Sequence, residues 1–156
     1  MAKSIDRVRD AALAAGLAIE IRRVGESTRT AEDAAAQCGV GVGQIVKSLI
    51  FQGERTGELF LFLVPGDRRL DAEKSAALAG ETLLRADPRL VRERTGFAIG
   101  GVSPIGHTIP ISAFADRAFE DHDLVWAAAG AHDAVFSCEP SALLKAANAR
   151  IADISA

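Results

Sequence analysis

Two short apolar runs separated by a polar turn constrain the fold more than any other feature of this sequence. Residues 45–52 read IVKSLIFQ and residues 58–65 read ELFLFLVP. Both runs have the length of a buried strand and are rich in apolar residues. The residues between them, Gly53 to Gly57, have the composition of a hairpin turn. The pair therefore predicts a central antiparallel hairpin.

The rest of the chain alternates between short helices and short strands. Helices are predicted where a capping residue or proline precedes a suitable run. They begin at Ser4, Thr30, Asp71, Asp87 and Pro140, and the first four end at Gly16, Gly39, Gly80 and Gly96. Further strands are predicted at Ala18–Val24, Thr108–Ile111, Leu124–Ala128 and Ala134–Cys138. We therefore predict a single α+β domain over residues 1–156, with a mixed, largely antiparallel sheet flanked by helices.

Composition excludes several functional classes. Hydrophobic residues make up 49% of the chain and charged residues 25%, the balance of an ordinary globular protein. The formal net charge of −3 argues against a general binder of duplex DNA, which is usually basic, so any contact with nucleic acid is local. No apolar run approaches the ~20 residues that cross a bilayer, and no secretory signal is visible. We expect a cytoplasmic protein with neither DNA nor a membrane as partner.

The cysteines and histidines do not form a recognisable site. Cys38 and Cys138 are too few for a disulfide framework and have no nearby histidine signature, so we expect reduced, buried thiols. His107, His122 and His132 lack metal-ligand spacing. We expect no metal and no cofactor.

Lys47 is the first unusual residue, because it lies within an apolar strand. It shares one face with Ile45, Leu49 and Phe51, and the opposite face is also largely apolar. A lysine beside a core is costly unless its ammonium reaches a partner or a cleft. Either the side chain extends to water at a sheet edge, or it serves a site; the residues alone leave both readings open.

The second unusual feature is the glycine-rich stretch from Gly100 to Gly106, which reads GGVSPIG. Glycines let a ligand approach the backbone, and consecutive amides in such a turn can form an oxyanion hole. The alternative is a tight turn without a ligand. The stretch is neither a dinucleotide fingerprint nor a P-loop, and Ser103 lacks the context of a serine nucleophile.

These features occur together in one known family. The chain resembles the YbaK/EbsC family, also called prolyl-tRNA synthetase-associated domains. The matching stretches are residues 30–35, 44–51, 64–69 and 95–106, which include QIVKSLIF, VPGDRR and GGVSPIG. The order of the strand and the later glycine motif makes the match fairly specific.

The resemblance implies a sheet that closes toward a barrel and an enzyme that hydrolyses the ester joining a wrong amino acid to tRNA, commonly tRNA-Pro. It implies Lys47, Gly100, Gly101 and Gly106 as catalytic residues. It also implies a substrate pocket, for which we name Thr30, Ser48, Val102, Ser103, Pro104, Gly130 and His132. The residues Gly130 to Asp133 also have the composition of a hairpin turn. In that interpretation His132 belongs to the turn and does not face the pocket.

The implied partners are the 3′ acceptor end of an aminoacyl-tRNA and, as a candidate, a prolyl-tRNA synthetase. Arg68, Arg69, Arg85, Arg89, Arg92 and Arg94 are either a basic rim for phosphates or solvated surface. Two rival functions stay open, a non-catalytic module that binds tRNA or a synthetase, and a structural domain. The amino acid removed is also open, because Ser48 and Trp126 do not distinguish the cysteine-specific from the alanine-specific branch.

Overall fold

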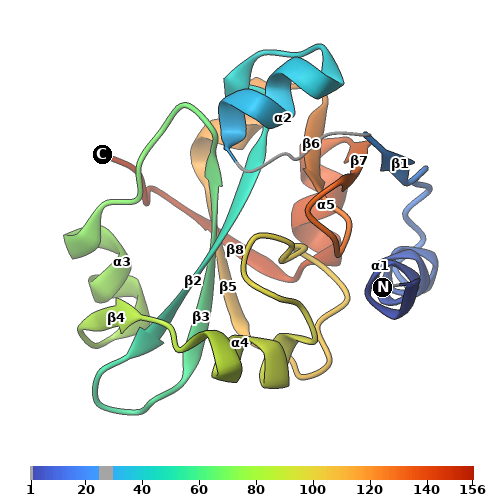
Figure 1. Ribbon diagram of the computed structural model, residues 1–156. Helices are drawn as coiled ribbons and strands as arrows, with labels where there is room; N and C mark the ends of the chain where they lie inside the picture. The colour runs from blue at the N-terminus through green and yellow to red at the C-terminus, as the bar shows by residue number, and fades with distance from the viewer. Residues whose placement is uncertain (1, 25–29) are drawn as a thin grey trace.

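A computed structural model describes residues 2–24 and 30–156, which form two β-sheets surrounded by helices (Figure 1). The larger sheet has five strands and the smaller has three. In spatial order the larger sheet contains β4 (Leu83–Arg85), β2 (Val46–Gly53), β3 (Leu59–Pro65), β5 (Ser112–Asp116) and β8 (Ala149–Ala152). The smaller sheet contains β1 (Arg22–Arg23), β7 (Ala134–Cys138) and β6 (Val125–Ala128). The predicted α+β class is confirmed.

The hairpin of β2 and β3 is the centre of the fold, as predicted. The two strands pair antiparallel from Val46 opposite Pro65 to Gln52 opposite Leu59. All seven residues of β3 are buried. Because side chains alternate along a strand, Leu61 and Leu63 belong to the main hydrophobic core while Phe60, Phe62 and Val64 form a second one. β3 therefore holds both faces of the sheet together.

The sheet is mixed because β5 runs parallel to β3 and β8 runs parallel to β5. The prediction of a strand at Thr108–Ile111 is wrong, since the strand begins at Ser112. Thr108 N–H donates to Thr95 O (3.1 Å) and Ile109 N–H to Arg94 O (3.0 Å). These residues thus satisfy carbonyl groups at the end of a helix rather than pairing in a sheet.

The five predicted helices are present. They are α1 (Ala2–Ala14), α2 (Ala31–Cys38), α3 (Ala72–Ala79), α4 (Pro88–Thr95) and α5 (Pro140–Ala146). The predicted cap at Ser4 is wrong, because the first helix already begins at Ala2 and Ser4 lies within it. Thr30 Oγ1 accepts a hydrogen bond from Asp33 N–H (3.0 Å) at the start of α2. Gly39, Gly80 and Gly96 end three of the helices in the left-handed conformation. Two short 3₁₀ turns, η1 (Val42–Gln44) and η2 (Arg117–Asp121), complete the elements.

The two sheets approach a barrel without closing it. A single parallel bridge between Ile45 and Trp126 joins them. On the same side of β2, β4 pairs only from Phe51 to Gly53. Among the described residues, no strand pairs with residues 47–50 on that side. We call this stretch the open edge of β2. Of the predicted strand Ala18–Val24, only Arg22 and Arg23 pair in a sheet.

Within residues 2–24 and 30–156 we find no helix with both the length and the apolar character needed to span a bilayer.

Leu61 offers a test of the central role of β3. Its side chain is completely buried, so Leu61→Ala leaves a cavity in the main core and should lower the free energy of unfolding by about 2–5 kcal/mol. Leu13→Ala, at a side chain that is 72% exposed, should change it by less than about 0.5 kcal/mol. Urea unfolding of both variants measures the difference, and equal effects would contradict the assignment.

Candidate functional site

Lys47 lies on the open edge of β2 and is half-buried. Its Nζ donates a hydrogen bond to Arg68 O at 2.5 Å. Partial burial lowers the pKa of Lys47, the carboxylates of Glu32 and Asp67 raise it, and the guanidinium of Arg69 lowers it. The chain therefore places one ammonium group among charges of both signs, at the boundary between the core and water.

The loop from Phe97 to His107 faces the open edge of β2. Gly100 is exposed, has φ +98°, and leaves open space where a side chain would begin. The N–H of Gly101 donates to Ala98 O at 3.0 Å, so it is already used within the turn. A Cβ on Gly101 would lie 3.3 Å from Ala131 Cα, which shows how closely this turn packs on the small sheet. Of the two adjacent glycines, only Gly100 presents free backbone to a ligand.

A cavity of about 290 Å³ lies between the loop and the open edge, and we call it the central cavity. Its walls come from α2, β2, the glycine-rich loop and β6. Five predicted site residues line it, namely Thr30, Lys47, Ser48, Gly100 and Val102. Small side chains form much of the remainder, at Ala31, Ala34, Ala127 and Ala128. The structure thus brings the lysine and the glycine-rich loop to one cavity.

Two polar atoms at the wall of the central cavity lack partners. Ser48 Oγ and Trp126 Nε1 are buried and make no hydrogen bond within the described part of the chain. A buried polar group without a partner costs about 1–3 kcal/mol. Both atoms can donate to an acceptor. The cavity therefore combines apolar walls with hydrogen-bonding capacity that the protein itself does not satisfy.

Other predicted site residues lie outside the central cavity. Ser103 and Pro104 are buried behind the loop, and Ser103 O lies 2.8 Å from His107 Nε2. Gly106 packs against α1, where a Cβ would lie 3.0 Å from Arg7 O. A Cβ on Gly130 would lie 2.7 Å from Ser4 O.

His132 is exposed, in the turn between β6 and β7. It does not line the cavity. The turn between these strands is the hairpin that the sequence predicted.

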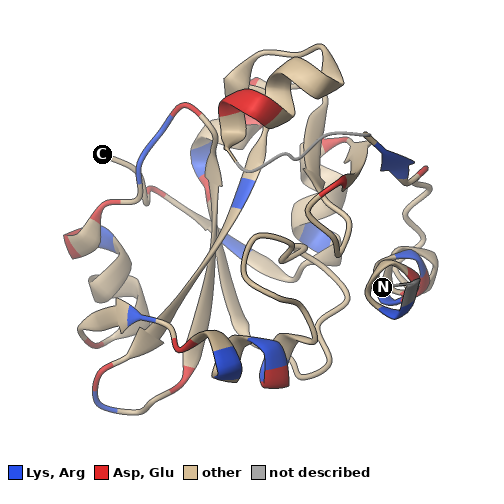
Figure 2. Ribbon diagram, in the orientation of Figure 1, with Lys and Arg blue, Asp and Glu red and all other residues tan. Residues whose placement is uncertain are grey.

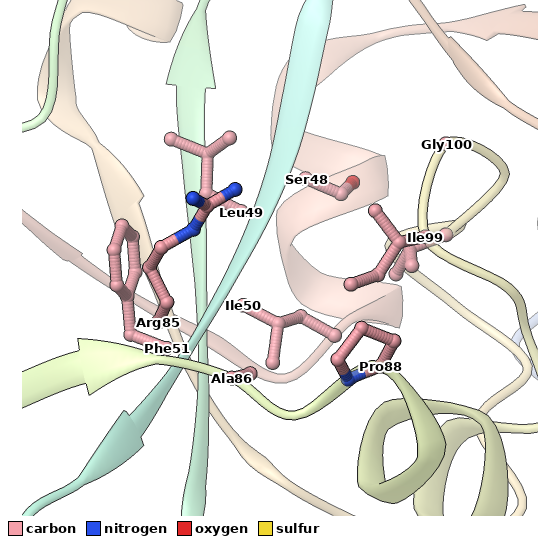
Figure 3. Close-up of a pocket in the computed structure, with 10 residues that line it drawn as sticks. Ser48, Leu49, Ile50, Phe51, Arg85, Ala86, Pro88, Ile99 and Gly100 are labelled. Atoms are coloured by element: carbon pink, nitrogen blue, oxygen red, sulfur yellow. The ribbon is translucent and has the colours of Figure 1, made fainter.

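Two clefts flank the central cavity. The outer cleft, about 320 Å³, is lined by Ala31, Glu32, Lys47, Gly66, Asp67, Arg68 and Arg69. The apolar cleft, about 450 Å³, lies on the other side (Figure 3) and is lined by residues 48–51, Arg85, Ala86, Pro88, Ile99, Gly100 and Val102. Lys47 borders the outer cleft and the cavity, and Ser48 borders the cavity and the apolar cleft. The three spaces therefore meet along the open edge of β2.

Figure 2 shows that basic positions cluster on α4 and on the loop between β3 and α3, with acidic positions among them. Of the six arginines considered as a phosphate rim, Arg68 and Arg69 line the outer cleft and Arg85 lines the apolar cleft. Arg89, Arg92 and Arg94 line none of the three spaces.

The thiols do not suit nucleophilic chemistry. Burial raises the pKa of Cys138 to about 12, with Glu139 adding to the effect. Burial also raises the pKa of Cys38. Both therefore stay protonated at neutral pH, and the thiol is the unreactive form. In residues 2–24 and 30–156 no His, Cys, Asp and Glu side chains group together as a metal site would require.

The sequence indicated Arg85 only as one of six arginines of a possible phosphate rim, and it did not place Trp126 or Ile99 among the site residues. Trp126 is the only tryptophan of the chain, and Ile99 is 59% exposed despite being aliphatic. Ile99 immediately precedes the glycine-rich motif, which is the one local signal that could have drawn attention to it. Trp126 and Arg85 reach the site only through the pairing of strands distant in sequence.

An apolar cavity entered past one cation and a glycine-rich turn has the shape and charge that suit a small acyl or anionic ligand. Comparison with known proteins identifies the class. The aminoacyl-tRNA editing domain model matches residues 25–146, and this chain belongs to that family. Its role is therefore in the editing of aminoacyl-tRNA.

Individual relatives agree. EbsC of Enterococcus faecalis, named for a proposed deacylation of Cys-tRNA(Pro) and Cys-tRNA(Cys), is 28% identical over 134 residues, covering 83% of this chain and 79% of EbsC. A proline–tRNA ligase of Thermosipho melanesiensis is 43% identical over 81 residues, which are 51% of this chain and 14% of the ligase. A crystal structure described as a proposed trans-editing enzyme for prolyl-tRNA synthetase superposes with a TM-score of 0.91 at 45% identity, covering 98% of this chain and 97% of that one.

His107 gives a test of how the loop is held. Burial lowers the pKa of His107 below its ordinary value, although the hydrogen bond to Ser103 opposes the shift. The unfolded chain therefore binds a proton more readily than the folded one, and stability is lost as pH falls from about 7 to about 5. His107→Gln keeps an N–H donor and should flatten this slope in urea unfolding. The same substitution at His122 is the control, and an unchanged slope in His107→Gln would refute the assignment.

Proposed function

We propose that this protein is a trans-editing hydrolase that removes a small amino acid wrongly esterified to tRNA, with tRNA-Pro as the main substrate. The observation that carries the proposal is the position of Lys47, which lines both a small, partly open cavity with mainly apolar walls and an outer cleft with further cations. An aminoacylated tRNA end has the matching parts, a small acyl group joined through ribose to a phosphate. Its place of action would be the cytoplasm, beside a prolyl-tRNA synthetase.

The central cavity supports selection by size. Four alanines and the flank of Trp126 leave room for a short side chain such as that of alanine, cysteine, serine or 2-aminobutyrate. Such selection is needed because a synthetase pocket discriminates by only about 1–3 kcal/mol per methylene. Ser48 Oγ and Trp126 Nε1 are available to hydrogen-bond the acyl ester. A polar contact of this kind fixes the orientation of a ligand in an apolar pocket.

The outer cleft supports recognition of a phosphate. Lys47, Arg68 and Arg69 supply three cations there, and Glu32 and Asp67 supply two carboxylates. The local excess of positive charge is small, as befits a protein that grips one RNA end rather than a duplex. The bond from Lys47 to Arg68 O holds the ammonium at the boundary, where it can reach the terminal phosphate or the ester.

The chemistry asked of the protein is modest because an aminoacyl ester is already activated. Lys47 orients the ester, and the free backbone at Gly100 stabilises the carbonyl oxygen as negative charge develops. A water molecule attacks the carbonyl carbon, and the ribose oxygen leaves. Neither cysteine nor Ser103 acts as a nucleophile in this scheme. None of the three lines the cavity, Cys138 and Ser103 are buried, and Cys38 is partly buried.

Lys47→Ala tests the proposal directly. Loss of the ammonium should lower kcat/KM for hydrolysis of alanyl- or cysteinyl-tRNA-Pro by about 10²- to 10³-fold, because one preorganised electrostatic contact is worth that much. The fold should persist, since Lys47 is only half-buried and makes one hydrogen bond through its side chain. Lys145→Ala, at an exposed lysine in the last turn of α5, is the matched control.

The assay should use a panel of tRNA-Pro species charged with proline, alanine, cysteine, serine or 2-aminobutyrate. Binding of charged tRNA by the wild-type protein without turnover of any species would instead support a non-catalytic module. Normal turnover by Lys47→Ala would remove Lys47 from the mechanism.

A further inference from the structure

The apolar cleft beside the central cavity has no role in the scheme above. It is the largest of the three spaces, and it shares Ser48, Leu49, Ile99, Gly100 and Val102 with the central cavity. A ligand whose ester occupies the central cavity can therefore extend into this cleft without crossing the protein. We propose that the apolar cleft holds the adenine base of the 3′-terminal nucleotide of the tRNA; this inference rests on the proposed function.

The walls of the cleft suit a flat apolar ring. Figure 3 shows Ile50, Pro88 and Ile99 turned toward one another on one side of β2, with the hydroxyl of Ser48 nearby. Ile99 is 59% exposed and lines the cleft, so a ring bound there would cover part of this aliphatic side chain. A nucleobase stacks on such surfaces through its faces, whatever its sequence context.

The open edge of β2 supplies hydrogen-bonding groups for the rim of a base. Gly66 N–H donates to Ile45 O and Gly53 N–H donates to Glu58 O, so odd-numbered residues of β2 bond toward β3. In an antiparallel ladder the intervening residues face the other way. Ser48 therefore presents its main-chain N–H and C=O to the gap between β4 and β6, where no described strand lies opposite. Adenine carries both donors and acceptors on its edges.

Arg85 adds a positive charge at the rim. It lies in the edge strand β4, opposite Phe51 of β2. Figure 3 shows its side chain beside Leu49 and Phe51, across the edge of β2 from Ile50, Pro88 and Ile99. Its side chain is exposed and forms no hydrogen bond or ion pair with the described residues. A guanidinium in this position attracts the RNA backbone and can stack on an aromatic face.

The branching of the ligand matches the arrangement of the spaces. The terminal ribose carries three substituents, namely the acyl group, the base and the 5′-phosphate. The central cavity lies between the other two spaces, sharing Lys47 with the outer cleft and Ser48 with the apolar cleft. The acyl group would enter the central cavity, the phosphate the outer cleft and the base the apolar cleft.

Binding of a stable analogue tests the base site without requiring turnover. The probes are 3′-alanylamino-3′-deoxyadenosine, whose amide resists hydrolysis, and the same sugar without a base. By calorimetry the wild-type protein should bind the adenosine compound about 10-fold or more tightly than the abasic one. Ile99→Ala should remove most of that preference, and Arg85→Ala should reduce it about 2- to 5-fold.

Matched variants control for general effects of substitution. Ile109→Ala changes another exposed isoleucine, which lines none of the three spaces. Arg150→Ala changes an exposed arginine in β8, the opposite edge strand of the same sheet. Both should bind the two probes as the wild-type protein does.

The two proposals fail separately. If the wild-type protein hydrolyses mischarged tRNA but binds both probes equally, the base site is wrong and the hydrolase stands. If it prefers the adenosine probe but hydrolyses no charged tRNA, the hydrolase is wrong and the base site stands. A loss of affinity in Ile99→Ala that is equal for both probes, or that depends on the acyl side chain instead of the base, would assign the apolar cleft to the amino acid and overturn the inference.

Discussion

The unequal pairing of the two edges of β2 determines where the site lies. On one edge the strand is paired with β3 along nearly its whole length, and this edge is held by the fully buried hairpin partner. On the other edge it is paired only near its ends, by the bridge to Trp126 and by β4. The paired edge holds the backbone of β2 in position more precisely than a loop could. The unpaired edge leaves room for a cavity. Lys47 and Ser48 lie beside this gap, and the pairing of β2 with β3 fixes the position of their backbone.

The chemistry of the site follows from a conflict between burial and polarity. Lys47 is partly withdrawn from water, and Ser48 and Trp126 carry buried polar atoms without a partner among the described residues. Both features raise the free energy of the protein without a ligand. A ligand with oxygen acceptors would lower that free energy by accepting hydrogen bonds from these groups. A negatively charged protein can in this way bind an anionic ligand locally, because the relevant cations are concentrated at one opening rather than spread over the surface.

Local chemistry in the sequence was sufficient for the elements that depend on near neighbours. The central hairpin and the capped helices agree with prediction because turns, caps and left-handed glycines act within a few residues. The short strands β4 and β8 were not predicted, since three or four residues become a strand only through a distant partner. The misplaced strand at Thr108 has the same cause, because its backbone bonds to the end of α4 instead.

The site residues also differ in whether neighbours in the sequence or distant contacts reveal them. Lys47 and Gly100 stood out because each violates a local expectation, a cation in an apolar strand and a glycine cluster between apolar flanks. Arg85 and Trp126 violate nothing locally, and only the tertiary arrangement brings them to the gap. Gly106 and Gly130 also attract attention in the sequence, but the structure uses both for close packing on α1.

Through this packing α1 supports the glycine-rich loop, although the helix itself lines none of the three spaces. Arg7 donates to Gly96 O and lies over the ring of Phe97, while Gly106 rests on the backbone of the same helix turn. The helix therefore acts as a brace for the root of the glycine-rich loop, yet it precedes residue 25, where the match to the editing-domain family begins. Relatives can share the lysine strand and the glycine motif and still differ in this brace. A substitution in α1 would therefore act on the loop from behind, without changing any residue that lines the three spaces.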